Sequence, residues 1–186
     1  KKVFVRTDYN VPLDSNGKVT DDFRIRSSLP TIKFLLEQGA AVILASHLGR
    51  PKGAVIPELS LAPVARRLAK LVQAEVIFAP DCVGAEVESL AAKLLPGQIL
   101  LLENLRFHAA ETKNEPEFSK QLAALADVYV NDAFGTAHRA HASNVGMTEY
   151  FVDKAAGFLL MKEIEFLVSA IENPVRPFTV AMGGSK

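Results

Sequence analysis

The segment GAAVILASHLGR, residues 39–50, contains the pattern that decides the fold. Gly39 ends a predicted helix over Leu29–Gln38, for which Ser28 is the expected N-cap and Pro30 lies in the first turn. An unbroken apolar run then follows, Ala41–Ser46, and such a run is typical of a strand that is buried on both faces of a parallel sheet. The polar loop after it begins at His47. Helix, glycine, buried strand and polar loop together indicate an α/β unit.

The same alternation extends in both directions from this segment. Further apolar runs predict strands at Val3–Arg6, Glu75–Ala79, Gln98–Leu102 and Asp127–Asn131. Helical spacing predicts helices at Leu61–Leu71, with Ser60 as N-cap, and at Ala85–Leu94 and Pro116–Leu125. Crossovers of this length join parallel strands. The predicted fold class is therefore α/β, a Rossmann-like three-layer αβα sandwich around an open parallel sheet.

The last third of the chain has a different pattern. Ala155–Ile171 is one long amphipathic stretch, Asn173-Pro174 stops it, and Pro177–Met182 resembles a strand followed by a glycine pair. We therefore expect an α/β domain over residues 1–154, an interdomain helix or hinge over 155–174, and the first strand of a second domain over 175–186, whose remainder is absent.

Composition excludes several classes of protein. Hydrophobic residues make up 49% of the 186 residues and charged residues 23%, which is typical of a folded globular chain. Acidic and basic residues number 21 each, so no net charge favours nucleic acid or anionic lipid. Cys82 is the only cysteine and no apolar run is long enough to span a bilayer. We expect a cytoplasmic location, and a plastid or other organelle is also compatible because a cleaved transit peptide leaves no trace.

Polar residues follow four of the predicted strands, at the edge where α/β sheets bind ligands. This edge carries arginines at positions 50, 106 and 139, with Arg24 expected on the same side. Arginine suits bidentate contact with phosphate or carboxylate. Asp8 and Asn10 can hydrogen-bond a hydroxyl group. The pattern predicts a ligand that carries a phosphate, a hydroxyl and, in one interpretation, a carboxylate.

Other interpretations of these residues are weaker. His138 and His141 have a spacing that metal ligands use, but no thiolate is close in sequence, so no metal site is predicted. Asp132 is expected to orient a histidine or cap a turn. Neither common glycine-rich nucleotide fingerprint occurs. Cys82 is interpreted as a small buried residue, not as a nucleophile.

Long motifs in a fixed order resemble the phosphoglycerate kinase family. They are VRTDYNVP at 5–12, SHLGRP at 46–51, LENLRF at 102–107, VNDAFGTAHR at 130–139, ENP at 172–174 and GGSK at 183–186. The resemblance covers the whole chain, and Tyr9 stands where the family more often has Phe.

The resemblance implies a two-lobed kinase in which the first lobe binds 3-phosphoglycerate or 1,3-bisphosphoglycerate and the second binds Mg-ADP or Mg-ATP. It implies catalytic roles for Arg24 and Lys186, with Lys186 also near the nucleotide phosphate. The implied substrate-binding residues are Asp8, Tyr9, Asn10, Arg24, His47, Leu48, Gly49, Arg50, Arg106, His138 and Arg139. Because the nucleotide lobe supplies the Mg-ATP contacts, this chain is expected to be inactive alone and to need no cofactor or metal of its own.

Two other hypotheses come from different classes. The chain could serve as a folding or assembly module without retained ligand affinity, since closure of both lobes could be needed to order the site. A dinucleotide-binding oxidoreductase domain is the third hypothesis, and the missing glycine fingerprint argues against it. The intact enzyme is expected to be a monomer, whereas an uncovered face of the 155–171 helix favours self-association of this chain.

Overall fold

The computed structural model describes residues 1–181 and 183, and its central element is a parallel sheet. Six strands pair within this described part, in the order β3-β4-β2-β1-β5-β6. Their bounds are Lys2–Thr7 (β1), Ala41–Ala45 (β2), Val76–Phe78 (β3), Ile99–Leu101 (β4), Val128–Asp132 (β5) and Lys154–Ala156 (β6). All pairings are parallel, which confirms the predicted fold class.

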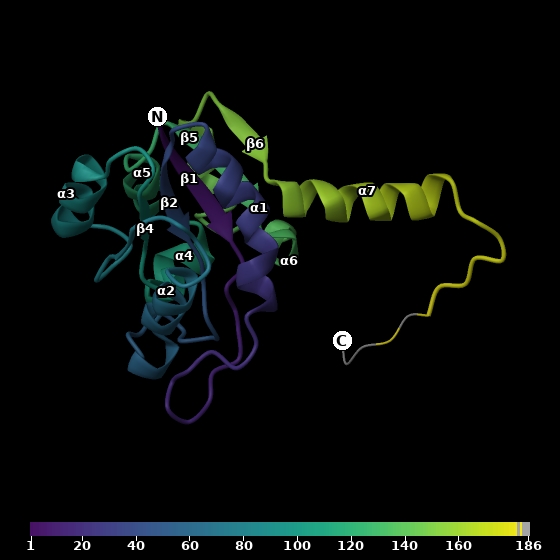
Figure 1. Ribbon diagram of the computed structural model, residues 1–186, viewed down its shortest axis with the longest axis horizontal. Helices are drawn as coiled ribbons and strands as arrows, with labels where there is room; N and C mark the ends of the chain where they lie inside the picture. Colours follow the sequence, from purple (N-terminus) through teal and green to yellow (C-terminus); the bar gives the residue numbers. More distant parts are fainter. Residues whose placement is uncertain (182, 184–186) are drawn as a thin grey trace.

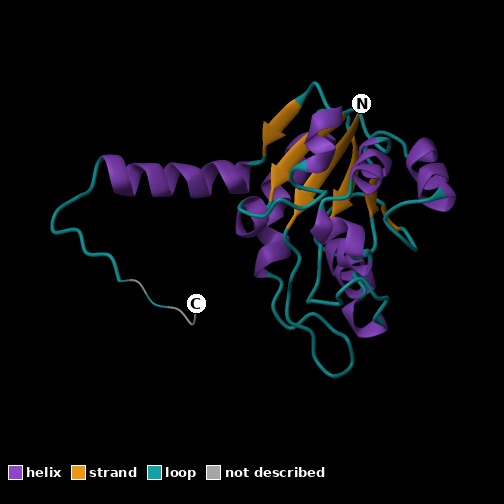
Figure 2. Cartoon of the chain, turned by 180° about the vertical axis from the view of Figure 1, so that it is seen from behind, coloured by secondary structure: helices purple, strands orange, loops and turns teal. Residues whose placement is uncertain are grey.

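Helices cover both faces of this sheet (Figure 2). The longer ones are α1 (Phe23–Glu37), α2 (Ala62–Leu68), α3 (Ala85–Lys93), α5 (Pro116–Ala123) and α7 (Phe158–Glu172). Short α4 (Ala109–Lys113) and α6 (Phe134–Ala137) and the 3₁₀ turns η1 (Pro57–Leu59), η2 (Leu105–Phe107) and η3 (Gly146–Tyr150) lie in the loops. Among the described helices, none is long and apolar enough to cross a membrane.

Two cores lie on opposite faces of the sheet because successive side chains of a strand point to opposite sides. Phe4 of β1 belongs to the core that includes Cys82, Phe118 and Tyr129. Its neighbours Val3 and Val5 belong to the other core, with residues of α1 and α2. Burial on both faces explains why these strands are apolar throughout.

Helix α1 corrects the prediction for its start. It begins at Phe23, not Leu29, so Ser28 is a buried residue of the helix interior and not its N-cap. Ile25, Ser28 and Ile32 are buried at a spacing of three and four residues, so the apolar stripe continues past the expected start. Pro30 lies inside the helix. In α2, Leu61 is the N-cap, although the Ser60 hydroxyl does accept a hydrogen bond from the Ala62 N–H at 3.1 Å.

The carboxyl-terminal third also differs from the prediction. Strand β6 occupies Lys154–Ala156, where the helix was expected to begin, and α7 starts only at Phe158. Gly157 ends the strand by allowing the close approach of Asp132, since a Cβ at this position would overlap the Asp132 carboxylate. The predicted strand at Pro177–Met182 is not formed over 177–181, and Met182 lies outside the described residues. A strand requires a neighbour to pair with, and this segment lies apart from the sheet (Figure 1).

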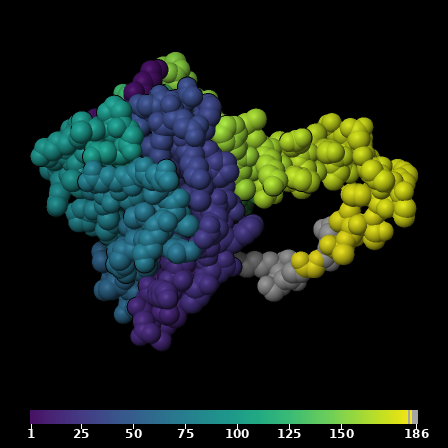
Figure 3. All heavy atoms as spheres, in the orientation of Figure 1, coloured from purple at the N-terminus to yellow at the C-terminus, as the bar shows by residue number. Residues whose placement is uncertain are grey.

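Helix α7 projects from the body of the molecule (Figures 1 and 3). Its first turn is fixed: the Phe158 N–H donates to Thr31 Oγ1 at 2.9 Å, and the Leu159 N–H donates to Asp132 Oδ1 at 2.9 Å. The Phe158 ring packs edge-on against Phe34 of α1. Asp132 therefore accepts hydrogen bonds from the first turn of a helix 27 residues further along the chain, whereas the sequence suggests that it orients a histidine or caps a turn.

Candidate functional site

A small polar pocket lies where four strands end. It has a volume of about 240 Å³ and receives residues from the loops after β1, β2, β4 and β5 and from the start of α1. Its lining is Asp8, Asn10, Arg24, His47, Gly49, Arg50, Arg106, Gly135, Thr136 and Arg139. Since β1 lies between β2 and β5, the chain crosses to opposite sides of β1, and the pocket occupies this topological switch point.

The wall formed by residues 46–50 is held in place from two sides. The Gly49 N–H donates to Asn10 Oδ1 at 2.9 Å, and Arg106 Nη1 donates to the Gly49 carbonyl at 2.9 Å. Gly49 has a φ of 61°, and a Cβ there would approach Leu59 to 2.8 Å. A glycine is therefore required for both the backbone conformation and the space. Three strand-end loops are locked together through this one residue.

Asp8 and Arg24 form an ion pair at the opposite wall. Asp8 also accepts a hydrogen bond from the Asn10 N–H at 3.1 Å. Gly135 keeps the space beside this pair open, because a Cβ there would lie 2.9 Å from Asp8 Oδ2. Asp8 thus shields part of the Arg24 charge.

Arginine supplies the positive charge of the pocket. Burial lowers the pKa of Arg106, and the nearby cations Arg6 and Arg139 lower it further. Its Nε is a buried donor without a partner within the described part of the chain. Crowded like charges and an unmet donor are both relieved by an anionic ligand with free acceptor oxygens.

His47 stays neutral in this environment. Burial, followed by the charges of Arg6 and Arg106, lowers its pKa to about 2. Arg6 Nη2 lies 3.3 Å from His47 Nδ1, and because arginine only donates, Nδ1 is the acceptor. The proton of the neutral ring is therefore on Nε2, which makes His47 a hydrogen-bond donor and not a source of charge.

Sequence reasoning missed Arg6 as part of the site. Arg6 is fully buried beneath the pocket, and its Nε donates to Ser143 Oγ at 2.8 Å. The Ser143 hydroxyl donates in turn to Glu111 Oε1 at 2.6 Å, and Glu111 is also fully buried. This hydroxyl bridge separates the two buried charges without a direct ion pair. The signal that could have found Arg6 is a cation that directly follows the apolar run Val3–Val5 of the first strand.

His141 was considered only as a metal ligand, and the structure places it in the same charged region. Burial and then Arg106 and Arg6 lower its pKa to about 4. Its Nδ1 lies 3.7 Å from Glu111 Oε1. Sequence spacing alone could not relate His141 to a glutamate 30 residues earlier.

Of the predicted site residues that the structure describes, three do not line the pocket. Tyr9 is buried, with its phenol 2.9 Å from Ser28 Oγ, and burial raises the pKa of that phenol. Leu48 is buried, and its carbonyl accepts a hydrogen bond from Asn104 Nδ2 at 2.8 Å. His138 is exposed beside the pocket and absent from its lining. Lys186 lies outside the described residues.

A second, larger hollow of about 850 Å³ lies elsewhere, between residues 16–22 and 63–70. Its most prominent cation, Arg67, is paired with Asp22 at 2.5 Å, and Asp22 also pairs with Arg26 at 2.9 Å. This hollow contains no strand end, and among the described residues none of its arginines has a buried donor without a partner. We therefore assign the chemistry to the smaller pocket.

Fold and pocket together define a class: open parallel α/β domains with an arginine-rich pocket at the carboxyl ends of the strands. The family model described as "Phosphoglycerate kinase" matches residues 1–186. The chain belongs to the phosphoglycerate kinase family.

Individual relatives agree with this assignment. The chain is 62% identical over 186 residues to "Phosphoglycerate kinase, cytosolic" of Triticum aestivum, covering 100% of this chain and 46% of the relative. It is 62% identical to "Phosphoglycerate kinase 2, chloroplastic" of Arabidopsis thaliana, covering 100% of this chain and 39% of that protein. The chain thus spans less than half the length of the curated relatives it matches.

Solved structures give the same result. The structure of phosphoglycerate kinase from Coxiella burnetii matches with a TM-score of 0.81 and 46% identity, covering 95% of this chain and 44% of the other. The enzyme from Pyrococcus horikoshii matches with a TM-score of 0.82 and 37% identity, with the same coverage of both chains.

Proposed function

We propose that this chain is the amino-terminal, phosphoglycerate-binding lobe of a phosphoglycerate kinase. The observation that carries the proposal is the convergence of Arg24, Arg50, Arg106 and Arg139 with Asp8 and Asn10 in one pocket. In the intact enzyme this lobe would hold 3-phosphoglycerate or 1,3-bisphosphoglycerate for reversible phosphoryl transfer in glycolysis.

The chemistry of the pocket suits such a ligand. Arg50, Arg106 and Arg139 would hold the phosphate that is not transferred, and the unmet donor of Arg106 would find an acceptor there. Asn10 and Asp8 would hydrogen-bond the hydroxyl end. Arg24 would exchange part of its contact with Asp8 for the carboxyl group and would stabilise charge on the phosphoryl group in flight.

Pocket size also supports a small ligand. The pocket has a volume of about 240 Å³. Pockets for drug-sized ligands range from about 300 to 1,000 Å³. A three-carbon phosphorylated acid suits this space, whereas a nucleoside triphosphate is too large for it.

This pocket therefore does not fit Mg-ADP or Mg-ATP, and we derive no catalytic step through the nucleotide. We propose that the carboxyl-terminal lobe of the intact enzyme binds it and that Lys186 approaches the phosphoryl group when the lobes close. On this proposal the chain alone binds substrate without turnover.

Calorimetry or NMR titration with 3-phosphoglycerate tests the proposal. We expect saturable binding that perturbs the loops carrying Arg50, Arg106 and Arg139. Glycerate, which lacks the phosphate, should bind much more weakly, and glycerol 3-phosphate, which lacks the carboxylate, should retain part of the affinity. No perturbation of these loops at millimolar 3-phosphoglycerate would refute the assignment.

An assembly role is the second candidate, and the exposed face of α7 favours it. On this alternative, the carboxyl-terminal lobe covers the exposed face of α7, and the pocket binds 3-phosphoglycerate only after the two lobes have associated. A well-folded chain with no 3-phosphoglycerate binding, which regains binding when the other lobe is added, would support it. The names of the relatives support a cytosolic or chloroplast location for the chain.

A further inference from the structure

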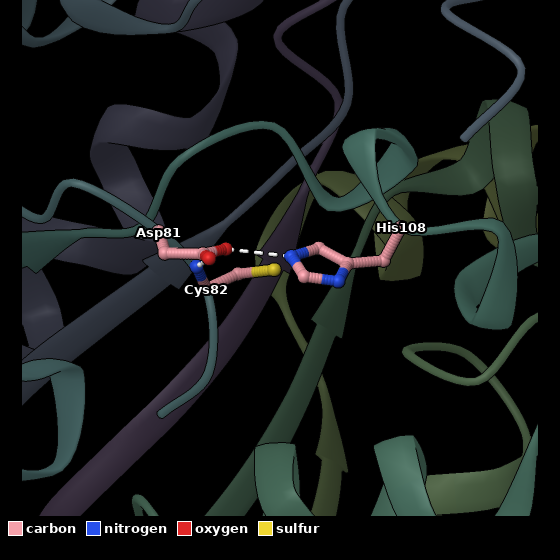
Figure 4. A group of neighbouring side chains, drawn as sticks. All are labelled: Asp81, Cys82 and His108. Atoms are coloured by element: carbon pink, nitrogen blue, oxygen red, sulfur yellow. Dashed lines mark hydrogen bonds and ion pairs between the residues drawn. The ribbon is translucent and has the colours of Figure 1, made fainter. Parts of the chain in front are cut away.

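Three side chains with metal-binding atoms meet outside the arginine pocket. Asp81 and Cys82 lie in the loop after β3, and His108 follows η2 in the loop after β4. One donor atom of each lies within 4.8 Å of the other two. β3 and β4 are neighbouring parallel strands, which brings their following loops to the same edge of the sheet. Figure 4 shows the Cys82 sulfur turned towards the His108 ring, and the Asp81 carboxylate facing the nearest nitrogen of that ring.

Hydrogen bonds already orient these groups. His108 Nε2 lies 2.6 Å from Asp81 Oδ1, and the same oxygen accepts a hydrogen bond from the Cys82 N–H at 2.6 Å. The His108 ring packs on Phe118, with ring centroids 5.2 Å apart. These contacts hold the three side chains close together before any ion arrives, which lowers the entropic cost of binding one. An ion would have to replace the hydrogen bond between Asp81 and His108.

Burial and charge fit a divalent cation. Cys82 is fully buried and forms the floor of the cluster, while the side chains of His108 and Asp81 are 32% and 48% exposed and leave a route from solvent. A thiolate and a carboxylate together cancel the charge of a divalent cation, so the loaded site would be neutral at its buried end. Thiolate, imidazole and carboxylate are the donors that Zn²⁺ takes, whereas Mg²⁺ and Ca²⁺ take oxygen.

A simpler interpretation is a hydrogen-bonded Asp–His pair that covers an inert thiol. Burial, and then the charge of Asp81, raises the pKa of Cys82 well above its usual value, so the thiol is protonated in the metal-free chain. This state disfavours a nucleophilic cysteine. It also means that metal binding must release the thiol proton, and that the His108 proton must move from Nε2 to Nδ1. The two interpretations differ in whether a metal can displace those protons.

We propose that Asp81, Cys82 and His108 form a binding site for one thiophilic divalent cation of the Zn²⁺ type, with the remaining coordination position left to solvent. The site is separate from the phosphoglycerate pocket and does not depend on the proposed function. An open position is typical of sites with three protein ligands.

Titration of the 186-residue chain with Co²⁺ tests the proposal, because Co²⁺ reports its ligands spectroscopically. We expect one equivalent to produce a thiolate-to-metal charge-transfer band together with visible bands of tetrahedral intensity. Cys82 is the only cysteine in the chain, so any such band belongs to this residue. Zn²⁺ should displace Co²⁺ and abolish the bands. Affinity should rise with pH and calorimetry should detect proton release, as thiol deprotonation requires.

Variants separate the site from adventitious binding. Cys82→Ser should abolish the charge-transfer band, and His108→Gln and Asp81→Asn should weaken binding by at least about tenfold, since even outer-shell partners contribute that much. His138→Gln is the matched control, because it removes an exposed histidine and should leave binding unchanged. His108→Gln alters a partly exposed side chain, so it remains informative if Cys82→Ser fails to fold. Absence of the band in the unaltered chain, or equal affinity in His108→Gln, would overturn the proposal.

Discussion

Arg106 shows how one side chain serves both the scaffold and the pocket. Its Nη1 fixes the Gly49 carbonyl, while its Nε has no partner within the described residues. Arg50 and Arg139 have no such structural bond among those described, so their replacement should affect ligand binding more cleanly. Substitutions of Arg50 and Arg139 therefore test phosphate binding more directly than a substitution of Arg106.

We predict that Arg50→Ala and Arg139→Ala each weaken 3-phosphoglycerate binding by about 1.5–3 kcal/mol, the scale of a charge-assisted hydrogen bond. Calorimetry measures the change directly. Arg66→Ala, which removes an exposed arginine of α2 outside the pocket, should leave the affinity unchanged. Unaltered binding in both pocket variants would show that these arginines do not converge on the ligand.

Stability should depend on pH through His47. The unfolded chain protonates this ring below about pH 6.5, whereas the folded chain does so only near pH 2. The unfolded state therefore binds more protons in this window, and the free energy of unfolding falls as the pH falls, by up to about 1.4 kcal/mol per pH unit from this group. Urea unfolding at several pH values should show that the free energy of unfolding falls less steeply with decreasing pH in His47→Gln than in the unaltered chain.

His141, with a pKa lowered to about 4, adds to the same loss between about pH 6.5 and 4. An identical pH dependence in His47→Gln and the unaltered chain would mean that His47 is not buried in its neutral form.

Residues that sequence patterns could identify are those at the ends of apolar runs. Arg50, Arg106 and Arg139 follow predicted strands, and their meeting follows from the parallel sheet alone. Arg6 and the Cys82–His108 neighbourhood were missed for a common reason. Their contacts join segments that are far apart in the sequence, β1 with residue 143 for Arg6 and two different loops for Cys82 and His108, and no spacing along the chain encodes such contacts.

At the scale of elements, the five apolar strands were predictable because burial on both faces makes each a continuous run. β6 was not, since Lys154–Ala156 is short, exposed and at the sheet edge. The start of α1 was mistaken because Ser28 and Pro30 resemble an N-terminus, whereas Ile25 already belongs to the buried stripe. The end of β6 and the start of α7 depend on contacts with Asp132, which is distant in the sequence, so the local pattern could not predict them.

Gly157→Ala should destabilise this junction by about 1–3 kcal/mol, the usual cost of overpacking. Its φ of −75° suits alanine, so the cost would come from overlap with the Asp132 carboxylate and not from the backbone. Urea unfolding measures it. In an Asp132→Ala background the same substitution should cost clearly less, and additive effects of the two changes would exclude direct steric coupling.

At the scale of the whole molecule, the apolar face of α7 is exposed and is not covered by the other described residues. Met161, Ile164, Leu167, Val168 and Ile171 recur every three or four residues and are exposed. Figure 3 shows this helix standing clear of the body. Burying such a face is favourable at about 25 cal/mol per Å² of apolar area.

We predict that the isolated chain associates as its concentration rises, and that Ile164→Lys combined with Leu167→Lys suppresses this. Sedimentation velocity measures the association. Affinity for 3-phosphoglycerate should be the same in both proteins, because the substitutions lie far from the pocket. A chain that stays monomeric at all concentrations would show that the α7 face is covered by other means.

The strand order has a consequence for how the chain is made. β1 is the first of the six described strands to be synthesised and occupies the interior of the sheet, paired on one edge with β2 and on the other with β5. Its second edge must wait for residues Val128–Asp132, so during translation most of the domain leaves the ribosome with an open, apolar strand edge at its centre. Unpaired edges of this kind are templates for aggregation. Slow translation between α2 and β5 should therefore increase the dependence of this protein on chaperones, although its finished sheet has β1 fully enclosed.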